Sequence, residues 1–108
     1  MSHRIERFSS TLKQCLGDIL VNNIQDPTLQ FLSISEVSVN PDLKRAKIYI
    51  SSPGQDPEIV LRHLHRAKGY FKKQLPVKMS LKYIPELEFK EDSVYQLDQK
   101  LAELEKKK

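Results

Sequence analysis

The chain contains one cysteine, three glycines, no tryptophan and no long apolar segment among its 108 residues. A lone Cys15 cannot form an internal disulfide, and the first ten residues lack the apolar core of a secretory signal. No segment approaches the run of about 18 apolar residues that a transmembrane helix needs. These absences predict a protein of the reducing cytoplasm, without a membrane span.

Groups that hold metals or perform catalysis are also scarce. His63 and His65 are two residues apart, which on a helix places them roughly 200° apart around the axis. The sequence has no glycine-rich nucleotide-binding motif and no Gly-x-Ser-x-Gly element. The acids near the C-terminus lack the spacing of a calcium-binding loop. We therefore predict no catalytic residues, no metal and no cofactor, and a binding protein in place of an enzyme.

Acidic residues are missing from one long internal stretch. Residues 59–85 contain no Asp or Glu, whereas residues 86–105 contain seven acids against two lysines. The acid-free stretch holds seven cations, which are Arg62, Arg66, Lys68, Lys72, Lys73, Lys78 and Lys82. A net charge of +4, concentrated in this way, favours binding to a polyanion. The alternative is an ordinary solvated helix face.

Apolar periodicity predicts the helices. A broad stripe with a period of 3.6 residues predicts a helix over residues 3–24, which Asp26-Pro27 ends. Cys15 lies inside that stripe, which favours a small core residue over a nucleophile. Asp56 is a good N-cap for a second helix, which should run to about Gln74, with Pro76 beyond it. Capping-box spacing after residue 92 predicts a last helix with a narrow apolar seam, formed by Val94, Leu97, Leu101 and Leu104.

Alternation of apolar residues predicts three strands. The first covers residues 32–39 and changes phase near Ser35-Glu36, which is typical of a β-bulge. A turn at 40–44 joins it to a second strand at 46–50, and the two should form an antiparallel hairpin. A third strand should begin near Met79 and continue past Pro85 through Leu87 and Phe89.

The order of these elements predicts one small α+β domain with a three-stranded sheet. A helix connects the second and third strands, so these strands can pair in parallel. Helices should cover one face of the sheet, because each strand has a single apolar parity. We assign residues 1–92 to the body of the domain and residues 93–108 to a C-terminal helix with a basic end that belongs to the same domain.

Gly69 interrupts the basic helix without interrupting its apolar pattern. Leu64, Ala67, Phe71 and Leu75 would fit one continuous helix, and a glycine inside it costs about 1 kcal/mol relative to alanine. Two reasons for a glycine are available. One is a backbone angle that only glycine adopts cheaply, and the other is close approach of another chain to a bare Cα. Either would bend the helix at residues 67–69, so substitution by alanine is expected to lower stability or binding.

Four segments in order give the chain a family resemblance. These are IQDPTLQ at 24–30, VSVNPDLKRAKIYIS at 37–51, AKG at 67–69 and LKYIPELEFKEDS at 81–93. Together they resemble the bacterial ribosome-binding factor A family over essentially the whole chain. The resemblance implies a type II KH-like fold, α-β-β-α-kink-α-β, in which a kink at Ala67 and Gly69 replaces the Gly-x-x-Gly loop of KH domains.

The resemblance also implies a function and partners. It implies a non-catalytic factor that binds immature small (30S) subunits and 16S rRNA, assists late 16S rRNA processing and cold adaptation, and is linked functionally to assembly GTPases. The free protein should be a monomer. The residues expected to contact RNA are Arg62, Arg66, Lys68, Gly69, Lys72, Lys73, Lys78 and Lys82, with Arg4, Arg7, Lys44, Arg45 and Tyr70 as weaker candidates. Thr28, Lys72 and Lys82 depart from the arginines frequent in the family, and lysine lacks the bidentate fork of arginine.

Two alternative functions and the role of two tyrosines remain open at this stage. The chain could be a protein-interaction module that uses the seam of its C-terminal helix. It could also be a general KH-like RNA binder that is not dedicated to the ribosome. Tyr70, and Tyr49 on the outward parity of the second strand, could stack on bases or could simply pack against the domain.

Overall fold

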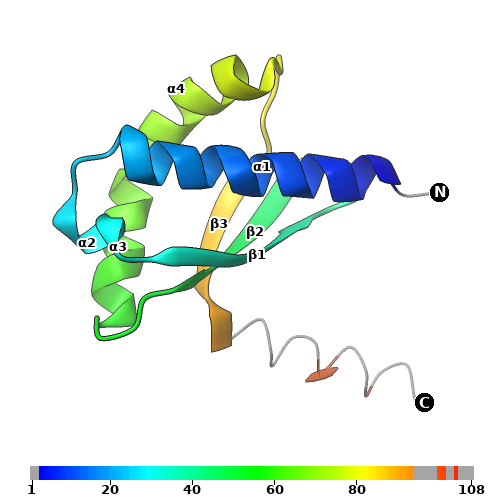
Figure 1. Cartoon of the computed structure of the whole chain (residues 1–108). Helices are drawn as coiled ribbons and strands as arrows, with labels where there is room; N and C mark the ends of the chain where they lie inside the picture. Colours follow the sequence, from blue (N-terminus) through cyan, green and yellow to red (C-terminus); the bar gives the residue numbers. More distant parts are fainter. Residues whose placement is uncertain (1–2, 94–99, 102–103, 105–108) are drawn as a thin grey trace.

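The computed structural model describes residues 3–93, 100–101 and 104 of the chain (Figure 1). The elements follow in the order α1 (His3–Asn22), α2 (Pro27–Gln30), β1 (Ser33–Val39), β2 (Arg45–Ser51), α3 (Pro57–Arg66), α4 (Lys68–Met79) and β3 (Glu86–Glu91). This order confirms the expected α+β class, with two helices joined at a kink before the last strand. No helix in the described part of the chain is both long and apolar enough to cross a membrane.

The three strands form one mixed sheet in the order β1-β2-β3. β1 and β2 are antiparallel, and β2 and β3 are parallel, with Ile48 opposite Phe89. The register shifts between Ile34 and Glu36, which confirms the predicted bulge. A bulge re-phases the strand, so Ile34 before it and Val37 after it both turn toward the helices although they are three residues apart.

Two side chains form hydrogen bonds with backbone groups of β1, which is an edge strand of the sheet. The Glu36 carboxylate accepts a hydrogen bond from the Val37 amide at 2.9 Å, and the Lys13 ammonium donates to the Ser35 carbonyl at 3.2 Å. Together with the bulge, these contacts make the strand a poorer template for pairing with another chain.

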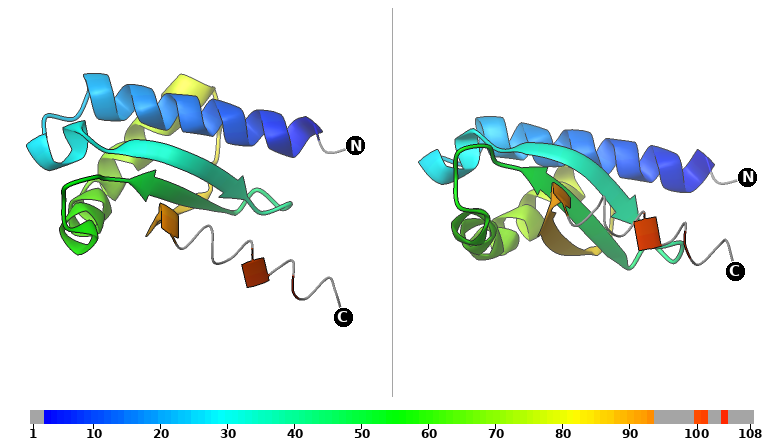
Figure 2. Two further views of the ribbon diagram at one scale, coloured as in Figure 1. Left: turned by 60° about the horizontal axis from the view of Figure 1, so that its bottom comes forward. Right: turned by 90° about the horizontal axis from the view of Figure 1, so that it is seen from below.

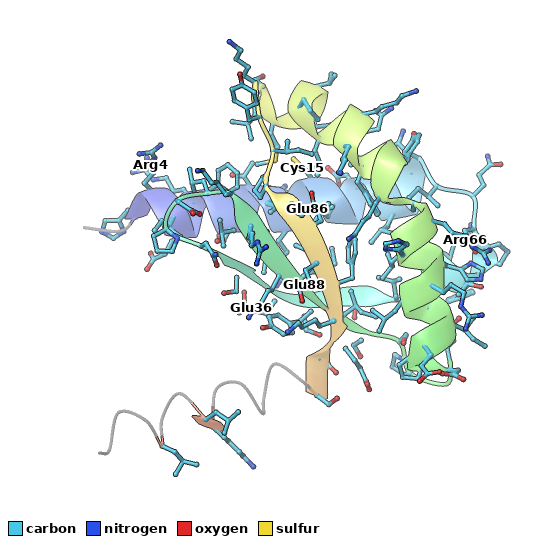
Figure 3. The ribbon with its side chains drawn as sticks, turned by 180° about the vertical axis from the view of Figure 1, so that it is seen from behind. Arg4, Cys15, Glu36, Arg66, Glu86 and Glu88 are labelled. Carbon is cyan, nitrogen blue, oxygen red and sulfur yellow. The ribbon has the colours of Figure 1, made fainter. Side chains whose placement is uncertain are left out.

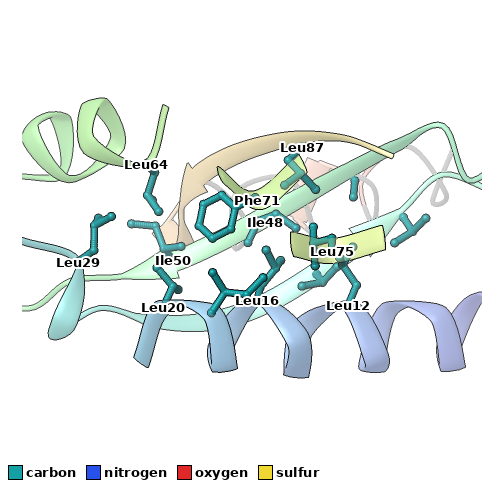
Figure 4. Packing of buried hydrophobic residues seen from close by; sticks show 14 of the residues in the cluster. Leu12, Leu16, Leu20, Leu29, Ile48, Ile50, Leu64, Phe71, Leu75 and Leu87 are labelled. Atoms are coloured by element: carbon teal, nitrogen blue, oxygen red, sulfur yellow. The ribbon is translucent and has the colours of Figure 1, made fainter. Parts of the chain in front are cut away.

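The core lies between the sheet and the helices that cover one of its faces (Figure 2). Leu12 and Leu16 of α1 lie opposite Phe71 of α4 and Ile48 of β2, and all four are fully buried (Figure 4). The Phe71 ring also contacts Phe89 of β3, with ring centroids 5.6 Å apart and an interplanar angle of 40°. Burial of one such side chain stabilises the fold by about 1.5–3 kcal/mol. No charged side chain is buried in the described part of the chain.

Two expectations about boundaries are wrong. α4 does not end near Gln74 but continues through Pro76 to Met79, because Met79 packs against the core one turn beyond the buried Leu75. Ser80 then adopts a left-handed conformation (φ 54°), and the Leu81 amide donates to the Pro76 carbonyl at 3.0 Å, which closes the helix.

The third strand begins later than expected. Residues 80–85 form a connection without regular structure, and β3 starts at Glu86, after the buried Pro85. Tyr83, which shares the strand parity of Leu87 and Phe89, is therefore not a strand residue and is 78% exposed. The predicted C-terminal helix, its seam and the boundary at residue 93 fall largely outside the described residues.

α2 is a single turn that the sequence did not predict. Asp26 caps it by accepting a hydrogen bond from the Thr28 amide at 3.0 Å, and the other Asp26 oxygen accepts one from His63 Nδ1 of α3 at 2.7 Å. The hydrogen bond from His63, followed by the one from Thr28, lowers the pKa of the Asp26 carboxyl below its usual value. One half-buried carboxylate thus ties α2 to α3.

We predict that Asp26→Asn lowers the free energy of unfolding by about 1 kcal/mol at pH 7, because asparagine keeps the cap but loses the charge-assisted bond to His63. A lowered folded-state pKa contributes stability above the unfolded pKa of about 4, and this contribution disappears as the pH falls through the folded pKa. The deficit of the variant should therefore shrink in urea unfolding below pH 4. Asp18→Asn, an exposed change on α1, serves as the control. An equal deficit for Asp26→Asn at pH 7 and pH 3 would contradict the linkage.

Candidate nucleic-acid interface

An elbow between α3 and α4 is the most distinctive feature of the basic segment. Ala67 ends α3 with φ −81° and ψ −5°, and its amide is shared between the carbonyls of His63 and Leu64, each at 3.1 Å. Its carbonyl accepts hydrogen bonds from the amides of Tyr70 and Phe71, which begin the next helical turn. The expected kink is thus confirmed, and it is centred on Ala67.

Neither of the two reasons suggested by the sequence explains why position 69 is a glycine. Its φ is not positive, whereas Gly54 in the loop before α3 has φ +80°. A Cβ added at Gly69 would meet no atom within 4 Å. The expectation that alanine at this position would strain the fold is therefore wrong. The residue presents a bare Cα to solvent in the first turn of α4.

Basic side chains surround this elbow. Arg62 and Arg66 are exposed one turn apart on α3, and Lys73 is exposed on α4 (Figure 3 labels Arg66). Lys68, at the first position of α4, is half-buried. No side chain caps the N-terminus of α4, whose amides carry the positive end of the helix dipole. The cations at this corner, together with the positive end of the α4 dipole, form a surface suited to phosphate groups.

Acids from β3 lie beside part of this surface. The Lys72 ammonium is 3.5 Å from the Glu86 carboxylate, and both side chains are about half-exposed. Lys68 lines a shallow depression together with Arg45 of β2 and with Glu86 and Glu88 of β3. The side of the elbow that faces β3 is thus partly neutralised, and the side that carries Lys73 is not. Sequence reasoning missed this because these acids lie outside the acid-free stretch along the chain.

The remaining cations form a second group at the other end of α4. Lys78 lies ten residues beyond Lys68, or about 15 Å along a helix, and Lys82 follows in the connection to β3. Arg4 and Arg7, two of the weaker candidates, are exposed on the first turns of α1 and are grouped with this end (Figure 3 labels Arg4, far from Arg66). The predicted contact residues therefore lie in two groups at the two ends of α4, with Lys73 five residues from both Lys68 and Lys78.

The other weaker candidates, and Tyr49, lie at separate places in the structure. Arg45 joins the elbow through the depression it shares with Lys68. Lys44 is exposed in the turn between β1 and β2. Tyr70 is half-buried and packs against the core. Tyr49 is only 3% exposed, so its ring is not available for stacking in this structure.

Side chains of the metal-ligating types and the one cysteine also lie in the described residues. No group of three His, Cys, Asp or Glu side chains within them could hold a metal ion. Burial raises the pKa of the Cys15 thiol, and Asp18 adds to the rise, while Lys78 opposes it. A raised pKa keeps the group as a thiol near neutral pH, which agrees with the packing role predicted for it.

The whole chain is similar to known proteins of one kind. The family profile of ribosome-binding factor A matches residues 4–105. Ribosome-binding factor A of Staphylococcus epidermidis is 36% identical over 103 residues, which covers 94% of this chain and 89% of that protein. The crystal structure of ribosome-binding factor A from Thermus thermophilus shares the fold, with a TM-score of 0.74 and 24% identity over 81% of this chain and 93% of that chain.

A further match comes from a complex of a relative. It is a homology model of the Thermus thermophilus ribosome-binding factor A, fitted into a cryo-EM map of a complex with the 30S subunit, and it has a TM-score of 0.65 and 26% identity. This match covers 76% of this chain and 88% of that chain.

We predict that Gly69→Ala raises the free energy of unfolding by about 0.5 kcal/mol. The added methyl group meets open space, and alanine is the better helix former, although the gain in a first turn is smaller than in a helix centre. Urea unfolding at neutral pH measures the change. Gly54→Ala is the matched control, and it should be destabilising because its φ is positive. A lower stability for Gly69→Ala would contradict the open surroundings of this residue.

Proposed function

Because the chain belongs to the ribosome-binding factor A family, we propose that it is a non-catalytic factor that binds the small ribosomal subunit through 16S rRNA. The observation that carries the proposal is the elbow between α3 and α4, which presents Arg62, Arg66 and Lys73 around an uncapped helix N-terminus. The related factor from Thermus thermophilus has been placed on a 30S subunit, which supports the same partner here.

The elbow would act by holding the RNA backbone. Phosphate oxygens would pair with the flanking cations, and the positive end of the α4 dipole would add to the attraction. The bare Cα of Gly69 lets a phosphate approach the helix backbone more closely than any side chain would permit. Gly69→Ala should therefore weaken subunit binding even though it stabilises the free protein.

Shape would supply the selectivity. The cations of the elbow would meet phosphates, and phosphate contacts by themselves carry no sequence information. We infer that the isolated protein binds many RNAs weakly, and that the arrangement of rRNA helices in an immature subunit provides discrimination.

The finer role follows from the same proposal. A factor that holds rRNA in an incomplete subunit would assist late maturation and processing of 16S rRNA in the cytoplasm. Its role would matter most in the cold, when misfolded RNA rearranges slowly into the correct structure. The factor would also be linked functionally to assembly GTPases. We propose that the free protein is a monomer.

Sedimentation of a cell lysate tests the proposal. The protein should travel with free small subunits and be absent from assembled ribosomes. A variant with Arg66→Gln and Lys73→Gln should remain at the top of the gradient. Exclusive sedimentation of the parent protein with assembled ribosomes or with soluble proteins would contradict the proposal.

The ion pair between Lys72 and Glu86 generates an electrostatic prediction. Lys73→Gln should weaken RNA binding and reduce the salt slope by about 0.7–0.9, the value for one phosphate contact, whereas Lys72→Gln should have a smaller effect. Glu86→Gln should strengthen binding, because it frees Lys72. Fluorescence titration with an rRNA fragment between about 50 and 200 mM salt measures the slopes.

Lys44→Gln is the control, because this lysine lies in the turn between β1 and β2 and outside both basic clusters. Equal effects of the Lys72, Lys73 and Lys44 substitutions would indicate a diffuse cationic surface and not the elbow.

A further inference from the structure

The second basic cluster borders an open hollow between α1 and the end of α4. The hollow measures about 470 Å³, its floor includes Phe8, Met79 and Leu81, and Arg4 and Arg7 line one side of it. Such a combination of an apolar floor with arginines at the rim differs from the elbow, whose exposed surface is almost entirely polar. Such a hollow suits a ligand that combines a flat, largely apolar ring with a separate negatively charged group.

The cations of the second basic cluster are not neutralised by ion pairs with described residues. Arg4, Arg7, Lys78 and Lys82 have no ion pair with any residue in the described part of the chain, whereas Lys72 at the elbow pairs with Glu86. The nearest acids on α1 are Glu6, which lies 3.6 Å from His3, and Asp18, which is seven residues beyond Thr11, or about 10 Å along the helix. The hollow therefore keeps a positive field.

An exposed aromatic residue, Tyr83, follows the hollow along the chain. Tyr83 is 78% exposed, and it follows Leu81 of the floor by two residues, a span of about 7 Å. The Lys82 ammonium lies over its ring, 5.6 Å from the centroid, so one face of the ring is next to a cation. The parity that places Leu87 and Phe89 on the core side does not hold for Tyr83, because the chain is not yet a strand there. The ring contributes little to the fold.

We propose that this hollow binds one unpaired nucleotide of the RNA, with its base stacked on Tyr83 and its phosphate held by Arg4 and Arg7. The inference rests on the proposed function and adds a second contact to it, at the opposite end of α4 from the elbow. Charge decides between RNA and an apolar peptide as the occupant, because Arg4 and Arg7 line the hollow and neither forms an ion pair with a described residue. Stacking on an aromatic ring tolerates any base, so the contact selects single strands and not a sequence.

Two fluorescent probes test the proposal with the full chain: the single-stranded octamer rU8 and an eight-base-pair RNA duplex formed from two strands, without a loop. Tyr83→Leu should weaken rU8 binding about tenfold and change duplex binding less than twofold, because only an unpaired base can stack. Tyr83→Phe should bind rU8 like the parent. A double change of Arg4 and Arg7 to Gln should weaken both probes, because both present phosphates.

Val77→Leu is the matched control, because Val77 is 77% exposed on α4 and does not line the hollow. It should change neither affinity. Unchanged rU8 binding by Tyr83→Leu, or equal loss with both probes, would overturn the proposal. The melting temperature of each variant should equal that of the parent, since the ring is outside the core.

Pelleting with purified small subunits separates this proposal from the function it deepens. If the parent protein pellets with subunits but Tyr83→Leu binds rU8 unchanged, nucleotide binding in the hollow is contradicted and subunit binding is supported. If the parent protein fails to pellet but Tyr83→Leu loses rU8 binding tenfold, subunit binding is contradicted and nucleotide binding in the hollow is supported.

Discussion

Burial of Phe71 against the sheet is the constraint on which the shape of the basic surface depends. Leu64 of α3 and Phe71 of α4 are both fully buried in the same core, and the Phe71 ring also meets Phe89 of β3. A straight helix over both segments would point away from the short sheet before its second half could be covered. Bending at Ala67 lets both apolar stripes face the sheet. The cations at the bend are turned outward as a consequence.

Local patterns predicted most of this fold, because local physics determines most of it. The phase change at Ser35-Glu36 could be read as a bulge, since a buried face demands one parity on each side of it. Asp56 and Pro57 likewise marked the start of α3 correctly. Patterns failed where tertiary packing decided the outcome. Burial of Leu75 and Met79 carries α4 through Pro76, and Tyr83 kept a strand parity without belonging to a strand.

The candidate site was harder to predict because charge along a chain is not charge in space. Residues 59–85 contain no acid, yet the parallel pairing of β2 and β3 brings Glu86 and Glu88 beside Lys68 and Lys72. The same topology separates Lys78 from the elbow by the length of α4. Seven cations in one acid-free stretch thus become two clusters with different neighbours. Only the paired register of β3 could have revealed this, and a single sequence does not supply it.

The distribution of polar groups also limits how such a domain can work. Because the described core is apolar, with no buried charge, its charged side chains lie and pair at the surface. Each contact made by such a surface is weak and is screened by salt, so selectivity must come from several contacts in a fixed geometry. A rigid α4 with one cationic cluster at each end provides that geometry. It holds two contacts at a set distance, which a folded RNA can match and a flexible strand matches only at an entropic cost.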